Sequence, residues 1–144
     1  MTRYLLDTNV ISEATKSRPL PTLIEWLGQQ DDATLFIATL TLAEIRRGIL
    51  EKAAGSKRRA LEKWFTGPEG PRTLFRGRIL SFDEESALEW ARLMAEGTAL
   101  GRPRSAIDMM IAAIASAHRS TVVTLNERHF RGAVAVINPA RSAI

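Results

Sequence analysis

The stretch YLLDTNVIS, residues 4–12, decides the fold of this 144-residue chain. Its first three residues form a short apolar run that we interpret as a buried strand, and this strand ends at Asp7. The polar residues that follow lead into a helix, which we expect over residues 9–15. A buried strand that passes directly into a helix is typical of the βαβ units that build parallel sheets.

The same alternation of strands and helices continues along the chain. Apolar runs predict strands at 34–38, 79–82, 121–124 and 133–137, and helical periodicity predicts helices at 20–29, 41–54, 56–65, 83–100 and 105–118. The stretch 66–71 is rich in Gly and Pro but is too short to separate two domains. We therefore expect residues 1–144 to form a single α/β domain, with a five-stranded, mainly parallel sheet flanked by helices.

The composition excludes several classes of protein. Hydrophobic residues make up 45% and charged residues 25% of the chain, which is typical of a folded domain. Because there is no cysteine, a disulfide scaffold, a Cys-ligated zinc site, an iron–sulfur cluster and thiol catalysis are all excluded. No signal peptide is visible, and the most apolar run, 109–115, is far shorter than the ~20 residues needed to cross a membrane. We expect a soluble, cytoplasmic protein without a membrane partner.

Positive charge is concentrated in the middle of the chain. The net charge is +4, but residues 46–78 alone carry ten basic and three acidic residues. A segment this basic is compatible with a polyanion such as nucleic acid. It is equally compatible with solvated helix faces that bind nothing, so charge alone leaves both interpretations open.

Four polar side chains stand where the chain leaves a strand or enters a helix. Asp7 follows the first predicted strand and Asn126 follows the fourth, while Glu44 and Asp108 lie in the first turns of predicted helices. In open α/β sheets, ligands bind beyond the carboxyl ends of the strands, where the strand order reverses. Oxygen-rich side chains that converge there would suit a hard divalent cation such as Mg²⁺ or Mn²⁺.

Each of these acids also has a purely structural interpretation. Glu44 follows Thr41, and Asp108 follows Ser105, with the spacing of a capping box, in which the acid satisfies a free backbone N–H. Asp7 could close a turn at the end of its strand. Spacing alone does not decide between capping and metal binding.

Four stretches together resemble the signature motifs of the PIN-domain family, in the order in which the family has them. They are LLDTNVIS at 5–12, TLAEIRRG at 41–48, DMMIAA at 108–113 and VTLNERHF at 123–130. The stretches GRP at 101–103 and VINP at 136–139 strengthen the likeness. Within the family, the chain is similar to the VapC-type (FitB-like) toxins of bacterial toxin–antitoxin pairs, and the likeness covers almost the whole chain.

The resemblance implies a PIN-like fold and a metal-dependent endoribonuclease that hydrolyses RNA phosphodiester bonds with Mg²⁺ or Mn²⁺. The metal ligands it implies are Asp7, Glu44 and Asp108, and the catalytic set adds Asn126. It also implies a cognate antitoxin that neutralises the enzyme, and a homodimer. Thr8 would help to orient the first of these acids.

The fourth motif departs from the family pattern. Family members carry an acid or Asn after the fourth strand, and often an acid just before the Phe. Here Asn126 occupies the first position and His129 the second, with Glu127 between them. The identity of the fourth ligand, and room for a second metal ion, therefore stay open. Asn9, in the first motif, is expected to orient Asp7 together with Thr8.

Three alternatives remain at this point. A metal-free ribonuclease would use paired histidines, but only His118 and His129 exist, and His118 ends a predicted helix, where a cation is favourable in any case. A haloacid-dehalogenase-type phosphatase would use Asp7 as its nucleophile, but Asn9 replaces the second acid which that class requires. A degenerate PIN domain that only holds RNA or protein is the third alternative.

Two further sets of residues have a functional and a structural interpretation. Arg46, Arg47, Arg102 and Arg104 could bind phosphate groups with their guanidinium forks or could be ordinary surface charge. Trp26, Trp64 and Trp90 lie on apolar helix stripes, so we expect them in the core and not as platforms for base stacking.

Overall fold

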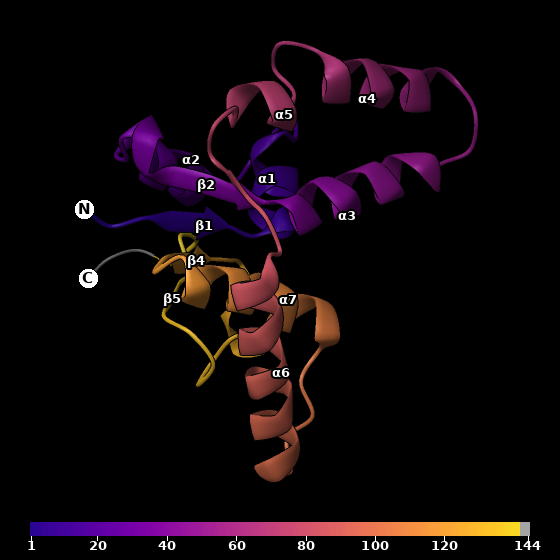
Figure 1. The fold of residues 1–144 in the computed structure, drawn as a ribbon. Helices are drawn as coiled ribbons and strands as arrows, with labels where there is room; N and C mark the ends of the chain where they lie inside the picture. The colour runs from indigo at the N-terminus through magenta and orange to yellow at the C-terminus, as the bar shows by residue number, and fades with distance from the viewer. Residues whose placement is uncertain (142–144) are drawn as a thin grey trace.

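The computed structural model describes residues 1–141 and has a parallel sheet at its centre (Figure 1). Its strands are β1 (Tyr4–Leu6), β2 (Leu35–Ala38), β3 (Ile79–Leu80), β4 (Thr121–Val123) and β5 (Val136–Ile137). The strand order is β3-β2-β1-β4-β5, and every neighbouring pair is parallel. The α/β class and the five-stranded parallel sheet are thus confirmed.

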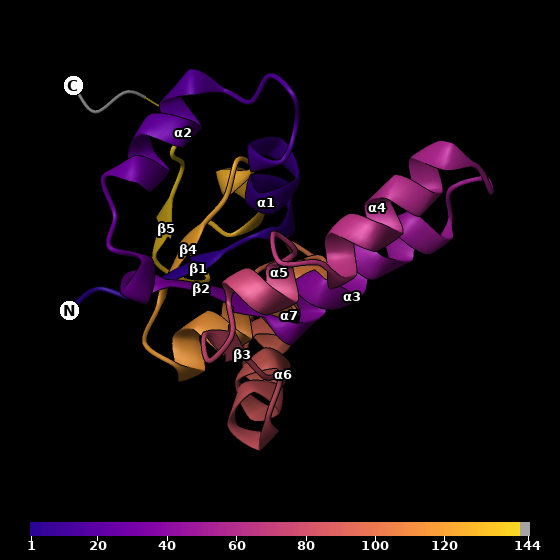
Figure 2. The ribbon, with the colours of Figure 1, turned by 90° about the horizontal axis from the view of Figure 1, so that it is seen from above.

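Helices connect the strands and cover both faces of the sheet. They are α1 (Thr8–Ala14), α2 (Pro21–Gly28), α3 (Thr39–Leu50), α4 (Ser56–Thr66), α5 (Pro71–Leu74), α6 (Glu84–Ala99) and α7 (Ala106–Ala117), with short 3-10 turns η1 (Asp32–Thr34) and η2 (Glu127–His129). Helices α3 and α4 lie side by side and project from the sheet as an arm (Figure 2). None of the helices between residues 1 and 141 is long and apolar enough to span a bilayer.

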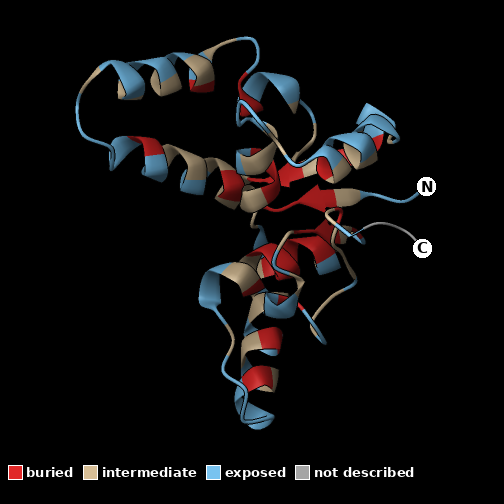
Figure 3. Cartoon of the chain, turned by 180° about the vertical axis from the view of Figure 1, so that it is seen from behind, coloured by how far each residue is buried: buried red, intermediate tan, exposed pale blue. Residues whose placement is uncertain are grey.

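Alternating residues of each strand supply two separate halves of the core. Leu5 and Val122 face helices α6 and α7, where they join a cluster that includes Met109. Their neighbours Leu6 and Val123 point to the opposite face and pack against α1 and α2. Successive strand residues alternate between faces, so a sheet covered on both sides needs apolar residues throughout each strand. The buried centre and the exposed outer ends of the helices are visible in Figure 3.

Some expected boundaries are wrong: the helix expected over 41–54 ends at Leu50, and the strands expected over 79–82 and 133–137 are shorter. Two other differences have a local cause. We expected a helix over 41–54, but α3 begins at Thr39 because Ala38, the last residue of β2, serves as its N-cap with an extended backbone. Helix α5 was missed because its surroundings are rich in Gly and Pro. Pro71 is its first residue, a position where the missing N–H of proline costs nothing.

All three tryptophans are partly buried, and two of them, Trp26 and Trp90, pack against the core as expected. Trp26 packs edge-to-face on Tyr4 at 5.1 Å, and the indole N–H of Trp90 donates to the carbonyl of Ala106 at 3.1 Å. Trp64 differs from these two because it lines an open cavity between helices. The expectation that it belongs to the core is therefore wrong.

The strand order reverses next to β1. From β1 the chain first builds β2 and β3 on one side, and later returns to place β4 and β5 on the other. Leu6 pairs with Val123, so the residues that follow, Asp7 and Thr124, leave the sheet next to each other. The backbone N–H of Asp7 donates to the carbonyl of Val123 at 2.8 Å. This reversal point is where open α/β sheets bind ligands.

Candidate active site

Asp7 is a buried carboxylate at the reversal point, with only 6% of its surface exposed. One of its oxygens accepts the backbone N–H of Thr8 at 2.8 Å, which makes Asp7 the N-cap of α1. The other oxygen accepts the hydroxyl of Thr124 at 2.9 Å. The pKa of Asp7 is raised from 3.8 to about 6, mainly by burial; the two hydrogen bonds oppose this shift, and the negative charges of Asp108 and Glu44 add to it.

The hydroxyl of Thr124 joins the ends of β1 and β4. It donates to Asp7, and it accepts the side-chain N–H of Asn9 at 3.2 Å and the backbone N–H of Asn126 at 3.0 Å. The amide oxygen of Asn9 in turn accepts the backbone N–H of Leu125 at 3.2 Å. A hydroxyl has one donor and two acceptor positions, so Thr124 is saturated and holds the first carboxylate in one orientation. Sequence reasoning missed this role, although Thr124 directly precedes the polar residues of the fourth motif.

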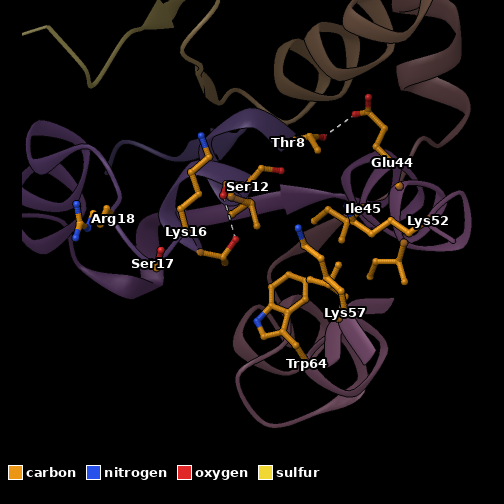
Figure 4. Close-up of a pocket in the computed structure, with 15 residues that line it drawn as sticks. Thr8, Ser12, Lys16, Ser17, Arg18, Glu44, Ile45, Lys52, Lys57 and Trp64 are labelled. Carbon is orange, nitrogen blue, oxygen red and sulfur yellow. Dashed lines mark hydrogen bonds between the residues drawn. The ribbon is translucent and has the colours of Figure 1, made fainter. Parts of the chain in front are cut away.

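Glu44 reaches the same region from helix α3. Because α3 begins at Thr39, Glu44 lies in the second turn and Thr41 is buried inside the helix, so the capping-box interpretation of Glu44 is wrong. Its carboxylate accepts the hydroxyl of Thr8 at 2.6 Å, as the dashed line in Figure 4 marks. The exposed Glu44 side chain therefore does not cap its own helix.

For Asp108, the capping and the metal-binding interpretations each hold in part. Ser105 caps α7 by accepting the backbone N–H of Asp108 at 3.3 Å, so half of the predicted capping box is present. The carboxylate of Asp108 instead contacts the imidazole of His129, with Nδ1 3.1 Å from Oδ2. The acid is therefore turned toward the residues that follow β4.

The fourth motif places its three polar residues in different surroundings. Asn126 and His129 line the same cavity as Asp7. Glu127 lies outside the lining of this cavity and forms ion pairs with Arg141 and, at 3.6 Å, with Arg131. Asn126 thus lies beside the acids, whereas Glu127 points away from the cavity and binds two arginines of the C-terminal part of the chain.

The two histidines do not form a catalytic pair. His118 ends α7, and its Nε2 lies 3.6 Å from Asp83 at the start of α6. His129 is the histidine that lines the acidic cavity. The arrangement therefore offers no pair of histidines for a metal-free ribonuclease, in agreement with the structural interpretation of His118.

Arg46 and Arg47 form contacts with residues of the α3–α4 arm. The guanidinium of Arg46 lies 3.9 Å from Glu62 and stacks over the ring of Phe65 at 5.8 Å, so it holds α4 against α3. Arg47 pairs at 2.5 Å with Glu51, the C-cap of the same helix. Neither residue lines the acidic cavity.

The other two arginines lie on the opposite side of the site. Arg104 is largely buried, donates to the carbonyl of Leu93 at 2.7 Å and pairs with Glu96 at 3.0 Å, so it is a structural residue. Arg102 is exposed and lines a shallow cavity that also reaches Asp108. Of the four arginines, Arg102 is the one that stands beside the candidate site with its charge available.

One cavity of about 660 Å³ brings the candidate residues together. Asp7, Glu44, Asp108 and Asn126, from four separate parts of the chain, all contribute to its lining. Between residues 1 and 141, no group of three or more acidic or histidine side chains is arranged closely enough to hold an ion directly. Mg²⁺ keeps several waters and is commonly held by one or two carboxylates, so this donor set suits it in kind and charge.

The comparisons with known proteins agree with this architecture. The family model described as PIN domain matches residues 4–134. The chain is 37% identical over 136 residues to toxin FitB of Neisseria gonorrhoeae, and 35% identical over 136 residues to VapC ribonuclease Y4jK of Sinorhizobium fredii; each alignment covers 94% of this chain and 96% of the relative. The crystal structure of FitAcB from Neisseria gonorrhoeae superimposes with a TM-score of 0.87 at 36% identity, covering 94% of this chain and 97% of that one.

The fold is a parallel sheet with an acid-lined cavity at the point where the strand order reverses. The family model matches nearly the whole chain, so the fold and the match together define the class of protein. The chain belongs to the PIN-domain family. Within that family it is similar to the VapC-type toxins, as the four sequence motifs predict. The phosphatase alternative is thereby excluded, because position 9 holds an asparagine where that class needs a second acid. The Asn9 side chain instead forms hydrogen bonds with Thr124 and Leu125.

Proposed function

We propose that this protein is a VapC-type toxin, an endoribonuclease that hydrolyses RNA phosphodiester bonds with the help of Mg²⁺ or Mn²⁺. The observation that carries the proposal is the convergence of Asp7, Glu44 and Asp108 on one cavity at the reversal point of a PIN fold. Burial of the first of these acids without a basic partner supports a cation in the working enzyme, since a buried charge is otherwise unfavourable.

The three acids would hold the divalent ion, either directly or through water. When bound, such an ion lowers the pKa of water and neutralises charge that develops on the scissile phosphate. Thr124 and the backbone N–H of Thr8 keep Asp7 in its orientation, and the hydroxyl of Thr8 positions Glu44. Hydrolysis adds water to phosphorus and breaks the bond to the leaving ribose oxygen.

Two residues at the rim complete the proposed chemistry. Asn126 adds an uncharged oxygen to the cavity, so its negative charge comes from the three carboxylates alone. That charge suits one divalent ion better than two. Arg102, beyond Asp108, can contact a neighbouring phosphate group of the substrate.

The proposed partners follow from the same family. A cognate antitoxin would neutralise the enzyme, the protein would act in the cytoplasm, and it would assemble as a homodimer. Co-expression in a bacterial host tests the first of these: growth arrest on induction of this chain should be relieved by the antitoxin encoded beside it and should be absent for Asp7→Asn.

The nuclease is tested by cleavage of labelled RNA with and without a divalent ion. Mg²⁺ or Mn²⁺ should support cleavage and EDTA should abolish it, and Asp7→Asn and Asp108→Asn should each lower the rate by orders of magnitude. Glu127→Gln is the matched control because it removes an acid next to the site but outside the cavity. Equal rates for all three variants would refute the proposal.

A binding module without activity is the second candidate, favoured by the amide at Asn126 where an acid could stand. The same assay separates the two functions. RNA that binds but stays intact with Mg²⁺ and with Mn²⁺ supports the binding module, whereas metal-dependent cleavage excludes it.

A further inference from the structure

His129 places a ring nitrogen beside one of the acids of the acidic cavity, which has a volume of about 660 Å³. Its Nδ1 lies 3.1 Å from Oδ2 of Asp108, and both residues contribute to the lining. The imidazole side chain is 56% exposed and the carboxylate side chain 22%, so ions from solvent can reach both. The chain has one other histidine, His118, which lies outside the lining and 3.6 Å from Asp83. A ring nitrogen in this cavity is therefore supplied by His129 alone.

The turn that carries His129 is held in place by its own hydrogen bond and by the core. The backbone N–H of His129 donates to the carbonyl of Asn126 at 3.1 Å, which closes the short turn η2. The next residue, Phe130, is fully buried in the core. On the other side of the contact, Asp108 lies in the first turn of α7, whose N-terminal end is capped by Ser105. Because both backbones are fixed, the fold itself brings the nitrogen and the oxygen together.

The spacing of these two atoms fits a shared ion. In octahedral coordination, neighbouring ligands subtend a right angle at the ion. With an imidazole nitrogen and a carboxylate oxygen each about 2.1 Å from the ion, the two ligand atoms are about 3.0 Å apart. The 3.1 Å between Nδ1 of His129 and Oδ2 of Asp108 agrees with this value. A direct hydrogen bond between the two side chains has a similar length, so the choice between the two arrangements depends on chemistry.

The donors of the cavity favour one of the two proposed ions. Mg²⁺ prefers oxygen ligands and gives up its water reluctantly, whereas imidazole nitrogen suits first-row transition-metal ions. Asp7, Glu44 and Asp108 supply the negative charge of the cavity, and Asn126 supplies an uncharged oxygen. A neutral imidazole at His129 adds a donor but no charge. Its contribution to the binding of Mg²⁺ is therefore small, and its contribution to the binding of Mn²⁺ is large.

We propose that Asp108 and His129 bind the ion as an oxygen–nitrogen pair, and that this pair makes the cavity prefer Mn²⁺ to Mg²⁺. Two direct protein ligands are consistent with the finding that, between residues 1 and 141, no three acidic or histidine side chains are close enough to hold an ion together. Asp7 and Glu44 then act on the ion through water and through their charge. This inference rests on the proposed nuclease function and narrows its cofactor from Mg²⁺ or Mn²⁺ to Mn²⁺.

Pulsed electron paramagnetic resonance of the RNA-free protein loaded with Mn²⁺ detects a nitrogen bound directly to the ion. We expect a nitrogen hyperfine coupling in the wild type, a change of that coupling when the histidines are isotope-labelled, and its loss in His129→Gln. His118→Gln is the matched control, because it removes the other histidine of the chain, which also lies beside an aspartate but outside the cavity. The control should keep the coupling. This measurement needs no RNA and no cleavage.

Calorimetric titration of the RNA-free protein with Mn²⁺ and with Mg²⁺ measures the selectivity. The titrations are run at about pH 8, because neutral imidazole is the form that binds metals. In His129→Gln, we expect the affinity for Mn²⁺ to fall by about tenfold or more and the affinity for Mg²⁺ to change by less than about twofold. A histidine that only pairs with Asp108 competes with the ion, so its removal would instead strengthen the binding of both ions. Circular dichroism and thermal melting verify that each variant is folded.

Each outcome bears on one proposal. A wild type without a nitrogen coupling, a coupling that survives in His129→Gln, or a preference for Mn²⁺ that is the same in His129→Gln and His118→Gln would overturn His129 as a ligand. The nuclease would then still stand on its cleavage assay. A nitrogen-bound Mn²⁺ ion in a wild type that cleaves RNA with neither metal would instead refute the nuclease and leave the ligand assignment intact.

Discussion

Ionisation of Asp7 should destabilise the protein when no cation is bound. Burial raises the pKa of this carboxyl group to about 6, against 3.8 for an ordinary aspartate. That difference corresponds to roughly 3 kcal/mol of folding free energy. In a domain of this size, such a change moves the melting temperature by about 10 °C. The perturbation that isolates it is Asp7→Asn, which keeps the shape of the side chain and removes the charge.

The direction of the pH dependence follows from the two pKa values. Below pH 3.8 the carboxyl group is protonated in both the folded and the unfolded chain. As the pH rises toward about 6, the unfolded chain releases the proton first, so the free energy of unfolding falls. Above that pH the loss is complete. Stability due to this group is therefore highest in acid and lowest at neutral pH.

Urea denaturation in EDTA at a series of pH values measures this effect. Glu13, Asp83 and Glu89 have lowered pKa values and change stability in the opposite direction, but they do so equally in the wild type and in Asp7→Asn. The difference between the two proteins should shift by up to about 3 kcal/mol in favour of Asp7→Asn between pH 4 and pH 7. Asparagine has one acceptor oxygen, so the variant loses one of the two hydrogen bonds that Asp7 accepts, and this adds an offset that does not vary with pH.

Mg²⁺ should remove this pH dependence, because the ion favours the ionised carboxylate. At about 100 times its dissociation constant it should stabilise the folded wild type by about 2.7 kcal/mol at neutral pH, and Asp7→Asn by less. The opposite result is a difference in the free energy of unfolding, between the wild type and Asp7→Asn, that stays constant with pH in EDTA. That result would show that Asp7 ionises in the folded protein as it does in water. The reasoning from its burial would then be wrong.

Three further substitutions test the site. Glu44→Gln should abolish most RNA cleavage without a large loss of thermal stability, since Glu44 caps no helix; a large loss of stability with full activity would contradict this. Thr124→Val should lower the free energy of unfolding, measured in urea, by about 2 to 3 kcal/mol because it removes a hydrogen bond to a carboxylate. Calorimetry of the RNA-free wild type should detect one Mg²⁺ per chain, and Asn126→Asp should tighten it; two tight sites in the wild type would refute the charge argument.

The position of the site could be predicted from the sequence because it depends on where elements end. Asp7 follows an apolar run that can only be a buried strand, and Asn126 follows another, so a parallel sheet brings both to one edge. Asp108 could be assigned to the first turn of its helix because Ser105 is a strong N-cap. These are local rules, and the structure follows them.

The contacts within the site could not be predicted, because they depend on distances between elements. Thr41 and Glu44 have the spacing of a capping box, yet β2 runs directly into α3 and the helix starts two residues earlier. The pairing of Glu127 with Arg141, which removes this acid from the cavity, joins residues whose relative position only the folded chain defines. The exposure of Trp64 likewise depends on the gap between α3 and α4, and not on its place in an apolar stripe.

The link that Thr124 makes between the ends of β1 and β4 affects when this protein becomes active during its synthesis. The ribosome makes Asp7 first, and its hydroxyl partner follows 117 positions later. At about 5 to 20 residues per second, the ribosome needs several seconds or more to make the intervening chain. Until then β4, one of the two strands that pair with β1, is incomplete, and the first carboxylate lacks the hydroxyl that orients it. A nascent chain, or one cut short by a premature stop codon before β4, therefore lacks an assembled site, and a toxic activity would start only once β4 has been made and has paired with β1.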